Sequence, residues 1–302
     1  MTRRRSRSKK NPLYLEDITD VLPFEGSRIE ANDFFSANLF MGLYDETQIM
    51  KKLEKVGIIQ ILQQKGFRKL LISIDKQDAY TSRLYVNFDT IAENTRLIEV
   101  IVREGFFKPK QSFIPAYDFT GGLPMLLIEW LTLQDPTAGF TSNRPRLPGQ
   151  DYPGLGGLKS MQEFLYKMGK ASGKAAIIDI PEHFHTAVIY SSLYSRIYSA
   201  TYSFFSPVDA GIMQAMKRDL NERSLAETSF AVAFDCLINS NTGDPARWIS
   251  SEQVYPISEK LKSYVEDDRY KEIALATMND SAFSINWEKF DRLKEKGLLN
   301  DL

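Results

Sequence analysis

The spacing of apolar residues divides the chain into a strand-rich first half and a helix-rich last third. From Glu46 to Lys65 apolar residues recur every three or four positions with charged residues between them, which predicts one amphipathic helix that ends at Gly66. Four apolar segments of strand length follow, at residues 69–74, 82–88, 96–103 and 125–133. The first two predict a hairpin, Gly105 is expected to close the third strand, and the short connections favour antiparallel pairing.

The fourth strand leads into a glycine-rich turn, Gly149 to Gly157, which is followed by an amphipathic stretch at 158–171 and a short apolar strand at 175–180. In a strand–turn–helix–strand unit, glycines let the backbone approach a ligand closely, and the helix N-terminus presents N–H groups to an anion. The candidate phosphate-binding residues are Arg146, Gln150, Gly154, Gly156 and Gly157, with Arg144 as a further cation. A second interpretation is that the glycines and prolines only turn the chain. The spacing matches neither a P-loop nor a Rossmann fingerprint.

The last third of the chain carries helical periodicity. Helices are predicted at residues 186–199, 208–220, 225–238, 256–278 and 287–297, with the fourth either a helix pair or one broken helix and with a strand as the alternative for 230–234. The predicted fold class is therefore α+β: a mixed, mainly antiparallel central sheet flanked by helices, with a helical C-terminal extension. We expect a disordered basic tail at 1–12, an α/β domain at 13–205 and a mainly helical extension at 206–302.

Charge and composition change this picture only at the N-terminus. The first ten residues hold six basic side chains and no acid, and since the net charge of the whole chain is −1, the remainder carries about −7. The negative charge of the chain beyond residue 10 argues against a general nucleic-acid binder. Nucleic-acid binding is therefore expected only through the basic tail. No apolar stretch follows the tail as in a signal peptide, and none reaches the ~18 residues of a membrane-spanning helix. We expect a cytoplasmic protein without a membrane partner; its oligomeric state stays open.

Two further groups of residues are candidates for chemistry. Glu129 lies between Ile128 and Trp130 in the fourth strand, where desolvation would raise the pKa of a carboxyl group and suit it to act as a base; Glu99 is second choice. The alternative is that Glu129 lies on the solvent face of an alternating strand. His183 and His185 are the only histidines in the chain, and in an extended segment both would point to one side of a cleft. No third ligand is evident nearby, so no metal is expected, and the alternative is that both rings shape the loop.

The single cysteine, Cys236, excludes an intrachain disulfide and a cysteine-based metal site and is expected to be a buried small hydrophobe. Tyr190 falls in a predicted helix together with other tyrosines at partly helical spacing. A core aromatic is the simplest interpretation for it.

The central unit resembles the GNAT-type N-acyltransferases over about residues 68–200. Gln150-Asp-Tyr-Pro-Gly154-Leu-Gly156 is similar to the family's Gln/Arg-x-x-Gly-x-Gly/Ala loop, with one residue more between Gln and the first Gly. His183-Phe-His-Thr-Ala-Val-Ile-Tyr190 is similar to its Asn-x-x-Ala-x-x-Leu-Tyr motif, with His183 in place of Asn, and the Gly-Phe that usually follows is absent. The resemblance implies acyl-CoA as co-substrate, a base that deprotonates an amine, and Tyr190 as the acid that protonates the leaving thiolate.

Three functions are compatible with these residues. The first is an acyl-CoA-dependent N-acyltransferase that acts on an amine or other small molecule, with Glu129, Tyr190, His183 and His185 as candidate catalytic residues. The second is a non-catalytic binding or regulatory protein on the same scaffold. The third is a nucleic-acid-associated protein that uses the basic tail.

Overall fold

The computed structural model describes residues 38–76, 78–193, 195 and 200–297, so the predicted tail at 1–12 lies outside the described residues. The first helical segment is two helices, α2 (Glu46–Lys55) and α3 (Ile58–Gln64), where the periodicity predicted one. Gly57 between them has a φ of 84°, a left-handed conformation that interrupts the helix. Asp45 and Gln48 form a capping box at the start of α2, which fixes where the helix begins.

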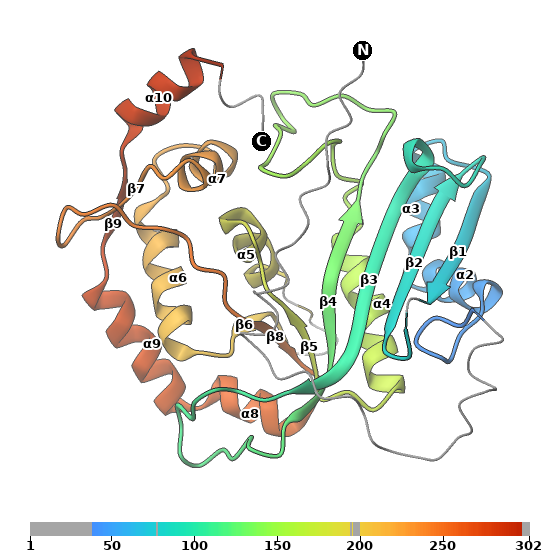
Figure 1. Ribbon diagram of the computed structural model, residues 1–302, viewed down its shortest axis with the longest axis horizontal. Coiled ribbons are helices and arrows are strands. Elements are labelled where there is room, and N and C mark those ends of the chain that lie inside the picture. The colour runs from blue at the N-terminus through green and yellow to red at the C-terminus, as the bar shows by residue number, and fades with distance from the viewer. Residues whose placement is uncertain (1–37, 77, 194, 196–199, 298–302) are drawn as a thin grey trace.

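The sheet has seven strands in the order β1-β2-β3-β4-β5-β8-β6 (Figure 1). Its first half is an antiparallel meander of β1 (Leu70–Lys76), β2 (Thr81–Phe88), β3 (Arg96–Phe107) and β4 (Leu123–Leu133), with a short 3-10 helix, Glu93–Thr95, before β3. The predicted hairpin and the four strands are confirmed. The expected end at Gly105 is wrong, because Gly105 pairs with Met125 inside the β3–β4 ladder.

The second half of the sheet begins with the only parallel pair among the described strands. β4 continues through a long connection to α4 (Leu158–Ala171), which returns the chain so that β5 (Ala176–Asp179) runs parallel to β4. Beyond β5 lie β8 (Gln253–Pro256) and β6 (Ser203–Phe204), both missed by the sequence analysis because they are so short. β8 comes from the segment expected to be a helical extension, so that segment also supplies a strand to the sheet.

The last third is mainly helical, as expected, but several boundaries differ. The helices are α5 (Phe184–Ser191), α6 (Pro207–Asp219), α7 (Leu225–Ala233), α8 (Glu259–Glu266), α9 (Asp268–Asp280) and α10 (Trp287–Glu295). Residues 256–278 form the helix pair α8–α9, which Asp267 separates by its extended backbone. The helix predicted at 225–238 ends at Ala233, and β7 (Leu237–Asn239) then pairs with β9 (Phe283–Ile285). Part of the helix predicted at 186–199 lies outside the described residues.

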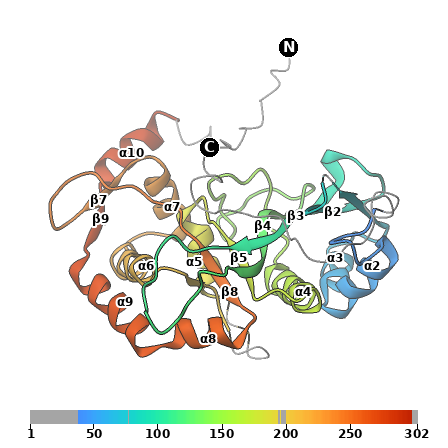
Figure 2. The same cartoon turned by 60° about the horizontal axis from the view of Figure 1, so that its bottom comes forward.

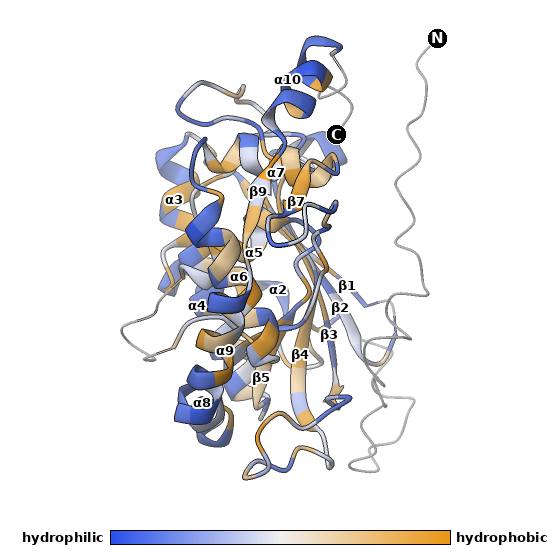
Figure 3. Cartoon of the chain, turned by 90° about the vertical axis from the view of Figure 1, so that its left-hand side faces the viewer, coloured by the Kyte–Doolittle hydropathy of each residue, from blue (hydrophilic) through white to orange (hydrophobic). Residues whose placement is uncertain are grey.

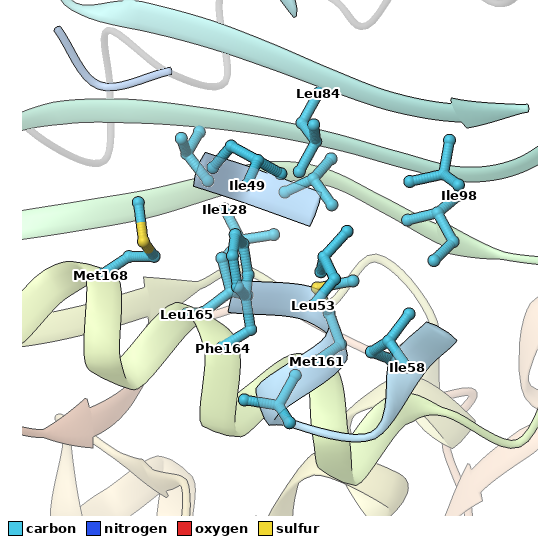
Figure 4. Packing of buried hydrophobic residues seen from close by; sticks show 14 of the residues in the cluster. Ile49, Leu53, Ile58, Leu84, Ile98, Ile128, Met161, Phe164, Leu165 and Met168 are labelled. Carbon is cyan, nitrogen blue, oxygen red and sulfur yellow. The ribbon is translucent and has the colours of Figure 1, made fainter. Parts of the chain in front are cut away.

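Two apolar clusters cover the two faces of the sheet, as the alternation along β4 requires. Leu126 and Ile128 join the cluster that packs against α2, α3 and α4, while Met125 and Leu127 join the one beneath α6, α8 and α9. Figure 4 shows the first cluster, in which side chains of α2, α3 and α4 meet those of the strands. In Figure 2, α2 and α3 lie at one end of the molecule and α6 and α9 at the other. Figure 3 shows the hydrophobic residues of β4, which both clusters use, and the largely hydrophilic α10.

The observed architecture is the α+β class predicted from the sequence, a mixed and mainly antiparallel sheet flanked by helices. None of the helices in the described ranges is both long and apolar enough to cross a membrane. That 13–205 forms a domain of its own stays a prediction.

Candidate functional site

β4 extends beyond the C-terminal end of β5, its parallel neighbour. The parallel ladder joins Met125–Ile128 to Ala176–Asp179 and stops there, although β4 continues to Leu133. A β-bulge lies at the same point, because Ile101 and Val102 of β3 pair with Trp130 and Ile128, so Glu129 is the extra residue. Bulges are frequent next to active sites because they redirect the strand. Ligands of sheets with parallel strands bind outside the carboxyl ends of those strands, which is where β5 ends and the bulge lies.

The glycine-rich turn takes the place beside β4 that β5 leaves. Leu155 N donates to Leu133 O at 3.1 Å, and Asp135 N donates to Pro153 O at 2.8 Å. Between Ile128, where the β4–β5 ladder ends, and Leu133, where the pairing with the turn begins, residues 129–132 separate the two pairings. The turn therefore lies at the C-terminal end of the parallel pair, between β4 and α4 in the order expected from the sequence.

The turn leads directly into α4, with Gly157 as the N-cap residue and no side chain capping the helix. A helix N-terminus without a side-chain cap keeps N–H groups for another acceptor, and its dipole favours an anion. Gly156 has a φ of +80° and no atom within 4 Å of a would-be β-carbon, so the backbone is accessible there. A β-carbon on Gly157 would lie 3.2 Å from Ile58 Cδ1, so this glycine serves the close packing of α3 against α4.

A cavity of about 380 Å³ lies beside the turn. Its lining consists of Lys65, Arg144, Pro145, Leu147, Gln150, Pro153, Gly154, Leu155 and Gly156. Two of these side chains are cations and none is a carboxylate, which suits an anionic ligand. The sequence analysis missed Lys65, because it lies at the end of α3 and only the packing of that helix brings it to the turn.

Arg146 and Gln150 brace the turn from within. Arg146 Nε donates to Gln150 O at 2.7 Å, and Gln150 Oε1 accepts from Leu147 N at 3.2 Å. Arg144 reaches across to the carbonyl of Gly154. Gln150 and Arg144 also line the cavity, whereas Arg146 is committed to the shape of the turn.

Glu129 forms an ion pair with Arg103 on β3, with 2.5 Å between Nε and Oε1. The Glu129 side chain is 17% exposed, so it lies neither in the apolar surroundings expected from its neighbours nor on an open solvent face. Glu99, the second choice, lies farther along β3 opposite Thr132 and pairs with Arg96 at 3.5 Å. The Arg103–Glu129 ion pair therefore lies at the bulge, beside the point where β5 ends.

The strand-like geometry expected for both histidines holds only for His183, whose backbone is extended just before α5, because His185 already lies in the helix. His183 is the N-cap residue and His185 belongs to the first turn, yet the two rings stack with 5.4 Å between centroids. Burial lowers the pKa of His183, and burial together with His183 lowers the pKa of His185 to about 3. Both rings are therefore neutral at pH 7. His183 also contacts Gly149, so the pair links α5 to the glycine-rich turn.

Tyr190 lies in the core, as its simplest interpretation predicted. Its side chain is 6% exposed and stacks on Tyr202 with 4.9 Å between ring centroids. Burial, with Asp179 nearby, raises the pKa of Tyr190 well above its usual value. Tyr190 thus belongs to a buried aromatic cluster in which Tyr202 contacts both Tyr190 and Tyr255.

No group of three or more His, Cys, Asp or Glu side chains in the described part of the chain is arranged to hold a metal ion. Cys236 is buried, and burial raises the pKa of its thiol, which makes it a poor nucleophile.

Comparison with known proteins found only a weak structural similarity. No protein-family model matches the chain, and no curated protein matches it. A solved structure of Elp3 from the archaeon Methanocaldococcus infernus, with residues 1–46 deleted, matches 43% of this chain at 14% identity, with a TM-score of 0.21. The match covers 32% of that protein, so the chain corresponds to about a third of its length. A likeness at this level defines neither a family nor a function.

Proposed function

We propose that the protein is an acyl-CoA-dependent N-acyltransferase of GNAT type. The observation that carries the proposal is that β5 ends beside the Glu129 bulge of β4, with the glycine-rich turn and the start of α4 at the same end of the parallel pair. A CoA-type ligand needs backbone N–H groups for its pyrophosphate and a slot between two strands for its pantetheine arm. The cavity at the turn, with Lys65 and Arg144 in its lining, supports an anionic ligand there.

In the proposed reaction an amine nitrogen attacks the thioester carbonyl carbon, the new C–N bond forms, and the C–S bond breaks. The attacking amine loses a proton to a base, and the leaving thiolate takes up a proton to become CoA-SH. Glu129 is the candidate base because it lies at the bulge, and backbone N–H groups of β4 at residues 129–132 are candidates to polarise the carbonyl. A base paired with Arg103 needs that ion pair to open when the amine binds.

Tyr190 and the two histidines have weaker support as reacting groups. Tyr190 lies in the aromatic core, so the CoA sulfur would have to enter that core to take a proton from its hydroxyl group. His183 and His185 are stacked and contact the turn, which favours a structural role for both.

The test is titration of CoA and acetyl-CoA into the full-length protein by calorimetry, with two matched glycine variants. Gly156 and Gly243 have φ values of +80° and +79°, and neither has an atom within 4 Å of a would-be β-carbon. Gly156→Asp adds a negative charge at the turn and should abolish binding, while Gly243→Asp imposes the same backbone strain far from the turn and should not. Absence of binding to the unmodified protein at millimolar ligand would exclude the proposal.

A second candidate, a non-catalytic binding or regulatory protein on this scaffold, is favoured by a specific observation. The candidate base has a cationic partner, and the candidate acid lies in the core. This alternative predicts that CoA binds, that no free thiol is released from acetyl-CoA with any of a panel of amines, and that Glu129→Gln leaves the affinity unchanged. Thiol release that depends on both an amine and Glu129 would exclude it. A nucleic-acid role would depend on residues 1–10, outside the described part of the chain, and stays a prediction.

A further inference from the structure

Two cations approach the cavity beside the glycine-rich turn from separate parts of the chain. Lys65 is the C-cap residue of α3, and Arg144 belongs to the connection between β4 and α4. The rest of the lining is apolar or uncharged, so the cavity is a locally positive site on a body that is acidic beyond its first ten residues. A ligand that fits must bring negative charge of its own.

Lys65 has hydrogen-bonding capacity left for a ligand. Its Nζ lies 3.9 Å from Asp135 Oδ2, which is an ionic contact longer than a hydrogen bond. The other carboxylate oxygen, Oδ1, accepts from Thr137 N at 3.1 Å and from Thr137 Oγ1 at 2.7 Å. Asp135 therefore holds the lysine near the cavity without using its three N–H donors in tight bonds.

Arg144 is placed in a similar way. One of its terminal nitrogens donates to the carbonyl of Gly154, and the residue is otherwise exposed. A guanidinium group has five N–H donors, so this contact aligns the side chain with the turn and leaves further donors toward the cavity.

Backbone amides and side-chain cations suit different phosphates. The amides of the turn and of the α4 N-terminus fit a pyrophosphate, whose oxygens each carry a partial charge. A phosphate monoester carries nearly two negative charges at pH 7 and is better matched by two cationic side chains. Of the phosphate groups of CoA, only the 3′-phosphate on the ribose is a monoester.

We infer that Lys65 and Arg144 bind the 3′-phosphate of CoA, so that the site distinguishes CoA from dephospho-CoA. This inference rests on the proposed function, because it assigns a second phosphate position within the same ligand. Lys65 then determines the preference for CoA over dephospho-CoA. Arg144 contacts both this phosphate and the carbonyl of Gly154 in the turn.

The experiment measures the affinities of CoA and dephospho-CoA by calorimetry for the full-length protein and three variants. Lys65→Gln removes the charge, Lys65→Arg keeps it, and Lys55→Gln removes the charge of an exposed lysine in the last turn of α2, outside the cavity. The unmodified protein should bind CoA at least 10-fold more tightly than dephospho-CoA, the range of one charge-assisted contact. Lys65→Gln should remove that preference by weakening CoA alone, whereas Lys65→Arg and Lys55→Gln should keep it.

The outcomes separate this inference from the proposed function. Equal affinity of the unmodified protein for both ligands overturns the inference and leaves the acyltransferase proposal standing. A preference for CoA that survives in Lys65→Gln overturns the role of Lys65. If neither ligand binds at millimolar concentration, the proposed function fails and the inference fails with it. Melting temperatures of the variants show that each one is folded.

Discussion

A β-carbon added to Gly149 would lie 2.8 Å from Nε2 of His183, so the backbone of the glycine-rich turn and the first residue before α5 are in direct contact. His183 in turn stacks on the buried ring of His185. The glycine-rich turn and the start of α5, which both contribute candidate site residues, therefore pack together through Gly149 and the imidazole of His183. The contact explains why a glycine is needed at position 149 in addition to its φ of +75°.

Gly149→Ala should destabilise the protein by about 2 kcal/mol, since it adds steric overlap with His183 to the cost of a positive φ. Gly173→Ala is the matched control, because Gly173 has a φ of +70° and open space around its would-be β-carbon. It should cost about 1 kcal/mol. Urea denaturation measures both free energies of unfolding. If His183→Ala does not recover the additional cost at Gly149, the overlap is not its cause.

Glu129→Gln should lower kcat by about 100-fold or more if Glu129 is the base, with little change in the affinity for CoA. Glu104→Gln is a suitable control, because Glu104 also lies on the central sheet and pairs with Lys174 at 2.7 Å, but away from the bulge. Steady-state rates of thiol release check both. Equal effects of the two substitutions would mean that Glu129 acts only through its ion pair.

The stacked histidines should make the protein less stable in acid. The pKa of His185 is lowered from 6.5 to about 3 on folding, so the unfolded chain binds the proton first as the pH falls. This contribution to stability is fully present above pH 6.5 and is lost as the pH falls toward 3, and the lowered pKa of His183 acts in the same direction. Unfolding free energies from pH 7 to 4 should fall by roughly 1–3 kcal/mol more in the unmodified protein than in His185→Gln. Parallel pH profiles would contradict the assignment.

The contact between α6 and α9 depends on Gly211. A β-carbon there would overlap with Ala274 O and lie 2.6 Å from Thr277 Cβ, so the backbone of α9 would have to shift. Gly211→Ala should therefore destabilise the protein by about 3 kcal/mol or prevent folding. Gly121→Ala, at a position with nothing within 4 Å, should change stability by less than about 0.5 kcal/mol. Thermal denaturation distinguishes the two, and equal melting temperatures would refute the close packing of these helices.

The sequence by itself determined the elements whose period is long and regular. The strand pattern predicted the four strands β1–β4, and the helical spacing at 158–171 predicted α4. Each pattern extends over enough residues to tell the two-residue period of a strand from the 3.6-residue period of a helix. It also placed the glycine-rich turn between β4 and α4. Short or interrupted elements escaped it: β8 has four residues, and Gly57 divides a continuous apolar pattern into α2 and α3.

Only the tertiary structure decided the surroundings of each candidate residue, because these depend on contacts between distant segments. Glu129 pairs with Arg103 because a bulge in β4 shifts its register against β3. No local sequence pattern predicts that bulge. Tyr190 is buried in a core cluster where it stacks on Tyr202, which contacts Tyr255 in turn. Lys65 reaches the turn almost 90 residues later in the chain because α3 packs against α4 through Gly157. The sequence indicated where along the chain the candidate site lies, and tertiary packing determined which side chains line it.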